Sequence, residues 1–313
     1  MMAGSSLQAH VPVMLDAVLE GLAVRADGFY VDGTFGRGGH SRALLERLGP
    51  DGRLLAMDRD PEAAKAASSF LGDPRFAFEA AAFSTMAEVL RRRGDAGLPA
   101  GVFLDLGVSS PQLDDAERGF SFQHDGPLDM RMDPGTGESA ADWLARATEQ
   151  EIADTIYQYG EERFSRRIAR AIVRARSEAP ITRTGRLAEL VRGAVPRREP
   201  GKHPATRTFQ ALRIRVNDEL RELERWLATI PEALPSGARV VVIAFHSLED
   251  RMVKRAFRGD REDAPRLPRG LPVNPEPVQR PLRPLGKPVR ADRAEQQRNP
   301  RSRSAVLRVA ERT

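Results

Sequence analysis

The sequence predicts an α/β fold, with a mostly parallel sheet covered by helices on both faces and a helical domain inserted between two of its strands. Continuous apolar runs alternate with helical segments in the first 114 residues, which is typical of buried parallel strands. No run between residues 115 and 217 resembles a strand, and a buried strand returns at residues 239–245. We therefore expect one sheet domain formed by residues 1–114 and 218–313, and an inserted helical domain at residues 115–217.

Short apolar runs predict the strands in chain order. The first three runs span residues 29–31, 53–57 and 101–104. Each is followed by an aspartate, namely Asp32, Asp58 and Asp105. Residues 304–309 predict a last strand that completes the sheet. Because ligands of open α/β sheets bind beyond the carboxyl ends of the strands, we expect the three acids to share one edge with a ligand.

Apolar spacing of three or four residues predicts the helices. Leucines in residues 41–48 indicate the first helix, and Pro61 opens the next at a position that favours proline. Residues 165–176 have an apolar face of Ile168, Ala171, Ile172 and Ala175 and an opposite stripe of Arg163, Arg167, Arg170 and Arg174. One long helix is expected from Phe209 to Leu227. It could form a homodimer seam, although packing onto its own domain is favoured.

The chain has 313 residues and no cysteine. This absence excludes disulfides, zinc sites of the CxxC type, iron–sulfur clusters and a thiolate nucleophile. His10, His124 and His203 show no metal spacing with carboxylates, so no catalytic metal is expected. The first ten residues are polar, and no run approaches the ~20 apolar residues of a membrane span. We therefore expect a cytoplasmic protein without a membrane partner.

Positive charge is concentrated in two regions. Residues 160–215 hold 15 Lys/Arg against 5 Asp/Glu, and residues 251–313 hold 17 against 7, although the whole chain carries only +5. Such clusters favour a polyanionic partner, because Lys and Arg gain affinity by releasing counterions from phosphates. Ordinary solvated arginine-rich faces would give the same composition. Residues 264–300 contain nine prolines and are expected to be extended or partly disordered.

The sharpest local signal is the segment DGTFGRGGHS at residues 32–41, between the first strand and its helix. Its glycines allow a ligand to approach closely, and Asp58 is placed to bind a ribose diol. Alone, the pattern also describes a dinucleotide site or a turn without a ligand. Asp32 favours S-adenosylmethionine (SAM), because a carboxylate repels a pyrophosphate but attracts the ammonium and sulfonium groups of SAM.

The absence of cysteine narrows the choice of methyl acceptor. Methylation at C5 of cytosine proceeds through a cysteine adduct, whereas an exocyclic amine, a ring nitrogen or a hydroxyl can attack a methyl group directly. Asp105 is the candidate catalytic residue that accepts a hydrogen bond from the amine, and a purely cofactor-binding role is the equal alternative. Phe120 or Phe122 could stack on a flipped base, or could equally pack between the two domains.

Two histidines lie beside these segments. His40 follows the glycine turn, where a backbone or cofactor contact is favoured over catalysis. His246 follows the strand at residues 239–245, where a structural role is favoured over a proton relay.

Several longer segments resemble one known family. They include HVPVML from residue 10, MDRDP from residue 57, LDLGVSSPQLDDAERGFSF and DGPLDMRMD within residues 104–133, and FHSLEDRMVK from residue 245. The segments YGEERFSRRIARAI, HPATRTFQALRIRVN and NPRSRSAVLRVAE extend the match over nearly the whole chain. On these motifs the chain resembles the MraW family, the bacterial small-subunit ribosomal RNA (cytidine-N4)-methyltransferases.

The resemblance implies a Rossmann-like SAM-dependent methyltransferase sheet with an inserted all-helical domain that recognises the substrate. It implies methylation of the exocyclic N4 of a cytidine in the decoding region of 16S ribosomal RNA, within the small ribosomal subunit. Matching positions imply cofactor contacts, in addition to Asp32, by Gly38, Gly39, His40, Asp58, Phe83, Asp105 and Gln112. The arginine stripe is the expected RNA surface, with the Pro/Arg-rich tail as a second. A non-catalytic RNA-binding factor and a nicotinamide oxidoreductase are the alternatives.

Overall fold

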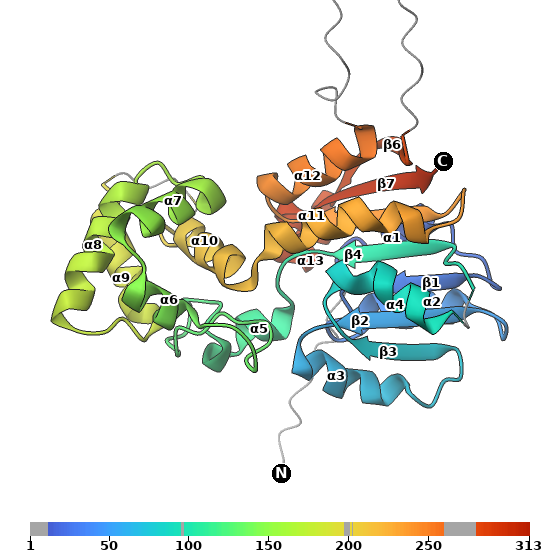
Figure 1. Ribbon diagram of the computed structural model, residues 1–313, viewed down its shortest axis with the longest axis horizontal. Coiled ribbons are helices and arrows are strands. Elements are labelled where there is room, and N and C mark those ends of the chain that lie inside the picture. The colour runs from blue at the N-terminus through green and yellow to red at the C-terminus, as the bar shows by residue number, and fades with distance from the viewer. Residues whose placement is uncertain (1–11, 95–96, 197–200, 202, 260–279) are drawn as a thin grey trace, which may run out of the picture. The chain divides into compact units, whose positions relative to one another are not determined.

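The computed structural model describes residues 12–94, 97–196, 201, 203–259 and 280–313. The chain divides into two compact units (Figure 1). Residues 1–107 and 222–313 form the first, here called the sheet unit, and residues 108–221 form the second, here called the helical unit. Among all the residues that the structure describes, no helix has the length and apolar content needed to cross a membrane.

The sheet unit is built on seven strands in the order β3-β2-β1-β4-β5-β7-β6. The first five in this order are parallel, and β7 is antiparallel to both of its neighbours. The bounds are β1 (Phe29–Asp32), β2 (Arg53–Asp58), β3 (Phe76–Ala80), β4 (Gly101–Asp105), β5 (Arg239–Ala244), β6 (Leu282–Arg290) and β7 (Val306–Arg312). The predicted α/β class is confirmed, and the direction in which successive strands are added reverses between β1 and β4.

Helices cover both faces of this sheet, which explains why its central strands are apolar without alternation. One face packs on α1 (Leu15–Leu22), α2 (Gly39–Arg47) and α3 (Pro61–Ala67). The other packs on α4 (Met86–Arg93), α11 (Glu219–Thr229) and α12 (Ser247–Arg258). In β1, for example, Tyr30 contributes to the first core and Val31 to the second. A short helix, α13 (Arg293–Arg298), precedes β7.

The helical unit has its own apolar core, which includes Trp143, Ile168 and Phe209. Its helices are α5 (Ser110–Asp114), α6 (Ala140–Arg146), α7 (Glu149–Gly160), α8 (Ser165–Glu178), α9 (Thr184–Ala194) and α10 (Thr206–Asn217). Ser139 and Thr148 are the N-cap residues of α6 and α7. Each forms a capping box, which satisfies backbone N–H groups of the first turn.

The expectation of one long helix from Phe209 to Leu227 was wrong. The structure has two helices, α10 and α11, separated by Asp218 in the left-handed conformation with φ 51°. Asn217 just before the break donates its side-chain amide to the carbonyl of Met130 and accepts from the N–H of Met132. Apolar spacing continues across the break, so it carried no signal of the turn.

The proline-rich tail also differs from expectation. Residues 264–279 lie outside the described residues, whereas residues 282–290 form the edge strand β6. Prolines 284 and 288 are tolerated because β6 pairs on one side only, with an irregularity between Leu285 and Val289. Strand β3 and helix α13 were likewise not predicted.

Candidate active site

Three aspartates end neighbouring strands of the sheet unit. Asp32 closes β1, Asp58 closes β2 and Asp105 closes β4, and β1 lies between the other two strands. The carboxyl ends of these parallel strands meet at one edge, here called the acidic edge. Since the strand order reverses between β1 and β4, this edge is where a sheet of this type opens a crevice for ligands.

Asp32 is a buried carboxylate with two internal hydrogen bonds. Its Oδ2 accepts from the Ser41 hydroxyl at 2.7 Å, and its Oδ1 accepts from the Thr34 N–H at 3.1 Å. Burial raises the pKa of Asp32 to about 6, the two hydrogen bonds oppose that rise, and the charge of Asp58 adds to it. Near neutral pH Asp32 is therefore an anion held in a buried position.

Asp58 binds the glycine turn to the end of β2. Its Oδ2 accepts from the N–H of Gly36 at 2.8 Å, and its Oδ1 accepts from the N–H of Asp60 at 2.9 Å. Burial raises the pKa of Asp58, against the opposing effect of these two bonds. Each carboxylate oxygen keeps a second acceptor position, so the group can also receive hydroxyl donors from a ligand.

Asp105 is the least satisfied acid of the edge. Its backbone N–H donates to the Thr34 hydroxyl at 2.6 Å, and its Oδ2 lies 3.9 Å from Nδ1 of His40. Its Oδ1 is buried and has no hydrogen-bond partner among the described residues. Burial, followed by the charges of Asp32 and Glu249, raises the pKa of Asp105 well above its ordinary value. A buried acceptor without a donor is costly, which favours a ligand that brings a donor or a positive charge.

His40 lies in the first turn of α2 and is buried. Its Nε2 is 3.0 Å from the carbonyl of Val13, and its ring centroid lies 4.7 Å from that of Phe103. The backbone contact agrees with the favoured role for this histidine. With Nε2 engaged there, Nδ1 is the atom that faces Asp105.

Packing within the protein requires the glycines of the turn. Gly38 has φ 76° and caps α2, and a Cβ there would lie 2.5 Å from the Phe70 ring. A Cβ on Gly39 would lie 2.6 Å from the Pro12 side chain. Besides any close approach of a ligand, packing requires these glycines, because protein atoms already fill the space of the missing side chains.

Two further predicted cofactor residues lie on different units. Phe83 begins the short 3-10 helix Phe83–Thr85 after β3 and meets Trp226 edge to face at 6.4 Å between ring centroids. Gln112 belongs to the helical unit, where it is buried in α5 and accepts from the N–H of Ser109 at 2.8 Å. This bond closes the capping box of α5. The cofactor contact of Gln112 stays a prediction.

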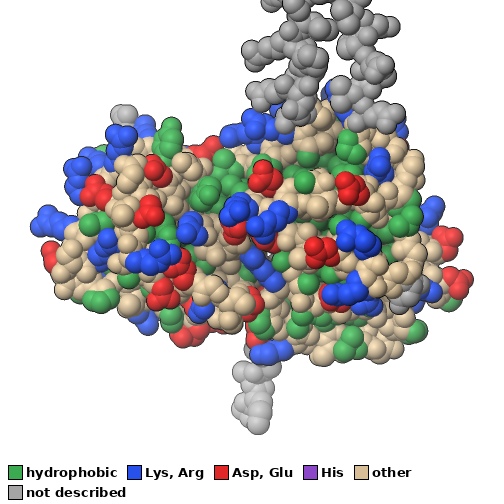
Figure 2. All heavy atoms as spheres, viewed as in Figure 1, with side chains coloured by type: hydrophobic (Ala, Val, Ile, Leu, Met, Phe, Trp, Pro, Cys, Tyr) green, Lys and Arg blue, Asp and Glu red, His purple; other side chains and the backbone are tan. Residues whose placement is uncertain are grey.

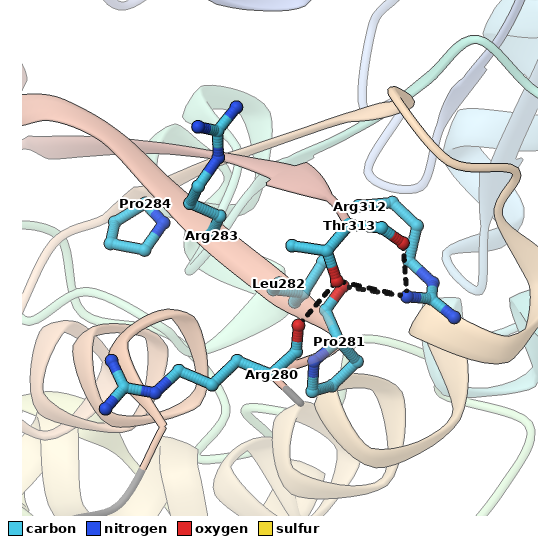
Figure 3. A pocket seen from close by; sticks show the side chains of 7 residues that line it. All are labelled: Arg280, Pro281, Leu282, Arg283, Pro284, Arg312 and Thr313. Atoms are coloured by element: carbon cyan, nitrogen blue, oxygen red, sulfur yellow. Dashed lines mark hydrogen bonds between the residues drawn. The ribbon is translucent and has the colours of Figure 1, made fainter. Parts of the chain in front are cut away.

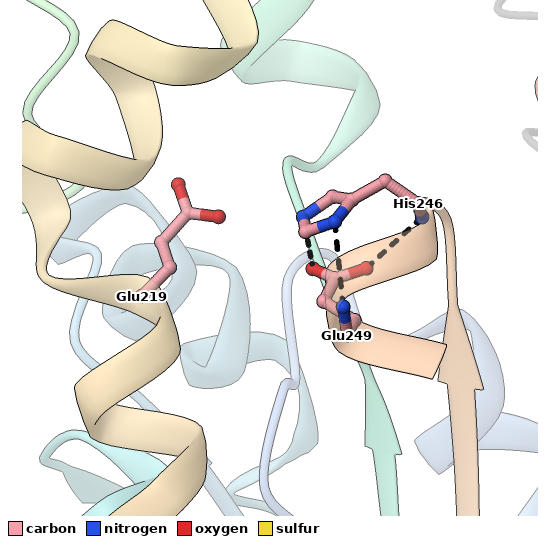
Figure 4. A group of neighbouring side chains, drawn as sticks. All are labelled: Glu219, His246 and Glu249. Atoms are coloured by element: carbon pink, nitrogen blue, oxygen red, sulfur yellow. Dashed lines mark hydrogen bonds and ion pairs between the residues drawn. The ribbon is translucent and has the colours of Figure 1, made fainter. Parts of the chain in front are cut away.

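Glu249 is an acid near this edge that the sequence analysis did not single out. His246 caps α12 by accepting the Glu249 N–H on Nδ1, while its Nε2 lies 3.1 Å from Oε1 of Glu249 (Figure 4). The Oε2 of Glu249 accepts from the N–H of Phe245 at 2.8 Å. The pair is buried, which agrees with the favoured structural role of His246. A capping acid three residues after the cap is a signal that could have indicated Glu249.

The acidic edge carries concentrated negative charge. Asp32 and Asp58 accept hydrogen bonds from hydroxyl and backbone N–H groups, which orient the carboxylates without neutralising them. A pyrophosphate would be repelled here, and a ligand with an ammonium and a sulfonium group would be attracted. The acids therefore fit SAM.

Three arginines of the stripe lie on α8 of the helical unit, and Arg163 lies two residues before the helix. Arg163, Arg167, Arg170 and Arg174 are exposed, and the opposite face of α8 is buried in the core. Arg170 lies 3.7 Å from Glu149, and Arg174 lies 3.9 Å from Glu178. On the face seen in Figure 2, acidic side chains are interspersed with the basic ones over the helical unit.

The two candidate stacking aromatics pack within the helical unit. Phe120 is buried in its core, and Phe122 is half-buried. The Phe122 ring stacks on His203 at 4.5 Å and meets Phe209 edge to face at 4.9 Å. His10 lies outside the described residues.

A separate pocket lies beside β6, the strand at one side of the sheet (Figure 3). It is lined by residues 280–284 and 312–313, where β6 begins and β7 ends. Arg312 is already engaged there, because it donates to the carbonyls of Pro231 and Pro281. Because β7 is antiparallel to β5, its end lies beside the amino end of β5, so this pocket is distinct from the acidic edge.

Comparison with known proteins identifies the family. The model of the MraW methylase family matches residues 7–313. The ribosomal RNA small subunit methyltransferase H of Thioalkalivibrio sulfidiphilus is 61% identical over 313 residues, with 99% of each chain covered. The protein of the same name from Chromohalobacter salexigens is 57% identical and covers 96% of this chain and 91% of its own. That from Coxiella burnetii is 53% identical, with 97% and 99% covered. A family match over nearly the whole chain, together with an edge that suits SAM, places this protein in the MraW methylase family.

Proposed function

We propose that this protein is a SAM-dependent methyltransferase that methylates the exocyclic N4 of a cytidine in the decoding region of small-subunit (16S) ribosomal RNA. The observation that carries the proposal is the acidic edge, where Asp105 has a buried oxygen without a donor beside two further acids. The relatives are named ribosomal RNA small subunit methyltransferase H, which supports the choice of substrate.

The residues that would hold SAM follow from their hydrogen-bonding capacity. Asp58 has acceptor positions for ribose hydroxyls, and Asp32 supplies negative charge beside the glycine turn. The remaining candidates are Gly38, Gly39, His40, Phe83, Asp105 and Gln112. When bound, SAM supplies a methyl group on a positively charged sulfur. The carboxylates attract this positive charge while SAM is bound. Protonation of the carboxylates removes the attraction and lowers the affinity for SAM.

Asp105 is suited to hold the acceptor amine. An exocyclic amine must keep its lone pair in line with the methyl group and must lose a proton as the new bond forms. The Oδ1 of Asp105 can accept one N–H of the amine and help to fix its orientation. Complete alignment of two reactants contributes roughly 7–11 kcal/mol in favourable reactions, and this hydrogen bond would supply part of it. Its raised pKa makes this carboxylate a stronger proton acceptor than an exposed aspartate.

The helical unit is the proposed substrate-recognition domain. We assign the first RNA contact to the exposed arginines of α8, and we propose the RNA within the small ribosomal subunit, in the cytoplasm, as the substrate. A homodimer through α10 and α11, the helices that replace the single expected helix at residues 209–227, is not favoured. Phe209 and Leu212 are buried in the core of the helical unit, and Leu223 is buried in that of the sheet unit.

The test is methyl transfer from labelled SAM to small subunits, and to naked ribosomal RNA, that lack native modification, followed by nucleoside analysis. We expect N4-methylcytidine with the wild type and almost none with Asp105→Asn, at SAM concentrations that saturate both proteins. Label in another nucleoside would refute the proposed acceptor. SAM binding without transfer to either RNA would instead favour a non-catalytic factor that retains the fold.

A further inference from the structure

The outer face of α12 is a continuous cationic stripe. Val253 and Phe257 are buried in the core of the sheet unit and fix the inner face of the helix. The exposed face presents four cations at intervals of three, one and three residues, which is one side of a helix. They are Arg251, Lys254, Arg255 and Arg258.

The acids of α12 have other partners, and they form no ion pair with Lys254, Arg255 or Arg258. Glu249 is buried in the capping box with His246. Asp250 forms a bidentate pair with Arg308 of β7, at 2.7 and 3.0 Å. No acidic side chain of the described residues forms an ion pair with Lys254, Arg255 or Arg258.

Helix energetics alone do not account for four such cations. Arg255 and Arg258 lie in the last turn, where the helix dipole stabilises positive charge. Arg251 and Lys254 lie further from that end and gain little from it. Like charges three or four residues apart destabilise a helix by about 0.2–0.5 kcal/mol per pair, so the stripe is a cost that an anionic partner would offset.

The position of α12 connects the stripe to the acidic edge. The helix begins directly after β5, which is parallel to β4, so its first turn lies at the carboxyl ends of the strands. The charge of Glu249 in that first turn contributes to the raised pKa of Asp105. From Arg251 to Arg258 the stripe then runs about 10 Å away from the edge, at 1.5 Å per residue.

We infer that the outer face of α12 binds the phosphate backbone of the RNA strand whose base enters the acidic edge. The inference rests on the proposed function and adds an RNA contact on the catalytic unit itself. The acidic edge repels phosphates while it holds a base, so the strand needs cations just outside that edge to hold its backbone. A stripe that starts within one turn of the edge supplies them.

The experiment compares two triple variants that remove equal charge. The test variant is K254Q/R255Q/R258Q, and Arg251 is left in place. The control is R25Q/R47Q/R91Q, three exposed cations of the same unit in segments that lead into the amino ends of β1, β2 and β4. Arg47 and Arg91 are also last-turn cations, so the effect on helix dipoles is similar in the two variants.

Affinity for a single-stranded fragment of the small-subunit decoding region is measured at several salt concentrations. Each lost phosphate contact lowers the slope of log affinity against log salt by about 0.7, so the test variant should lose up to about 2. Its affinity at ~100 mM salt should fall at least about tenfold. The control should keep the wild-type slope, and K254R/R255K/R258K should restore it. Both triple variants should bind SAM like the wild type.

An unchanged slope in the test variant overturns the inference, as does an equal fall in the control. Because this readout is RNA binding and not turnover, it is separate from the methyl-transfer assay of the wild type. A wild type that transfers no methyl group refutes the proposed function, whereas a wild type that does so beside an insensitive test variant refutes only the role of α12.

Discussion

The acidic edge of the sheet unit and the arginine stripe of the helical unit use charge in opposite ways. Asp32 is buried, and backbone and hydroxyl donors hold its carboxylate in place. Arg170 and Arg174 are exposed, with acidic residues nearby that lower their net effect. A buried charge is difficult to replace and its energy depends strongly on its neighbours, whereas an exposed charge is screened by water and salt. We therefore expect substitutions at the edge to have large, specific effects and those in the stripe to have small, additive ones.

Replacing Asp105 should give the largest effect. Asp105→Asn keeps the size of the side chain but removes the proton acceptor and the charge, so the rate of methyl transfer should fall by at least about 100-fold. The free energy of unfolding should not fall, because the variant removes a buried negative charge near Asp32 and Glu249. Single-turnover rates and thermal unfolding measure the two quantities. A rate within threefold of wild type would contradict the role of Asp105.

Substituting a glycine of the turn should mainly affect stability. Gly38→Ala places a methyl group against the Phe70 ring and imposes a left-handed conformation on alanine. The left-handed conformation costs roughly 1–2 kcal/mol, and overpacking adds about 1–3 kcal/mol. Chemical denaturation should show the loss, and Gly193→Ala, where a Cβ meets nothing within 4 Å, is the control. If Gly38→Ala weakened only SAM binding, the glycine would serve the ligand and not the packing.

The pKa of Asp32 predicts how SAM binding depends on pH. Because this pKa is raised to about 6 from an ordinary value of 3.8, the folded state binds the proton more tightly than the unfolded chain does. The contribution of Asp32 to stability is therefore largest below pH 3.8 and falls by up to about 3 kcal/mol as the pH rises to about 6. SAM affinity should change in the opposite direction, rising about tenfold between pH 5 and 7 as the anion forms.

Calorimetric titration of SAM at several pH values measures that change. Asp32→Asn should give a weaker affinity that varies less with pH. Ser41→Ala should move the midpoint upward, because the hydroxyl that stabilises the anion is lost. An Asp32→Asn variant with the wild-type pH profile would show that another group titrates.

The smallest effect is expected from the arginine stripe. Replacing Arg163, Arg167, Arg170 and Arg174 by glutamine should weaken RNA binding several-fold and lower the salt slope by less than about 0.7 per residue. Stability should change by less than about 1 kcal/mol, because exposed ion pairs contribute little. Filter binding and thermal unfolding measure both. A loss of SAM affinity in this variant would break the contrast between the two regions.

The sequence predicted the central strands because burial on both faces makes them continuous apolar runs, and the aspartates mark their ends. It did not reveal the turn at Asp218, where apolar spacing continues through a change in backbone direction. It also missed β6, because prolines usually interrupt strands and are tolerated only at an edge.

Two interactions of Asp105 in the candidate site could not be predicted from the sequence. The hydroxyl of Thr34 accepts the N–H of Asp105, and the charge of Glu249 acts on the same residue. Both relations join segments far apart in the chain, and sheet topology alone brings them together. The proposed roles of Gln112 and of the α8 arginines stay predictions.

The pairing of β4 with β5 has a consequence for how the chain acquires its structure. These strands are neighbours in the sheet, yet the whole helical unit lies between them in the chain. Contacts between distant segments form late, whereas a continuous helical segment folds from local contacts. During synthesis the helical unit should therefore become compact while one side of β4 still lacks its partner, and an unpaired apolar strand is a site of aggregation. Because of the insertion, we expect the chain to be most prone to aggregation during synthesis before β5 emerges.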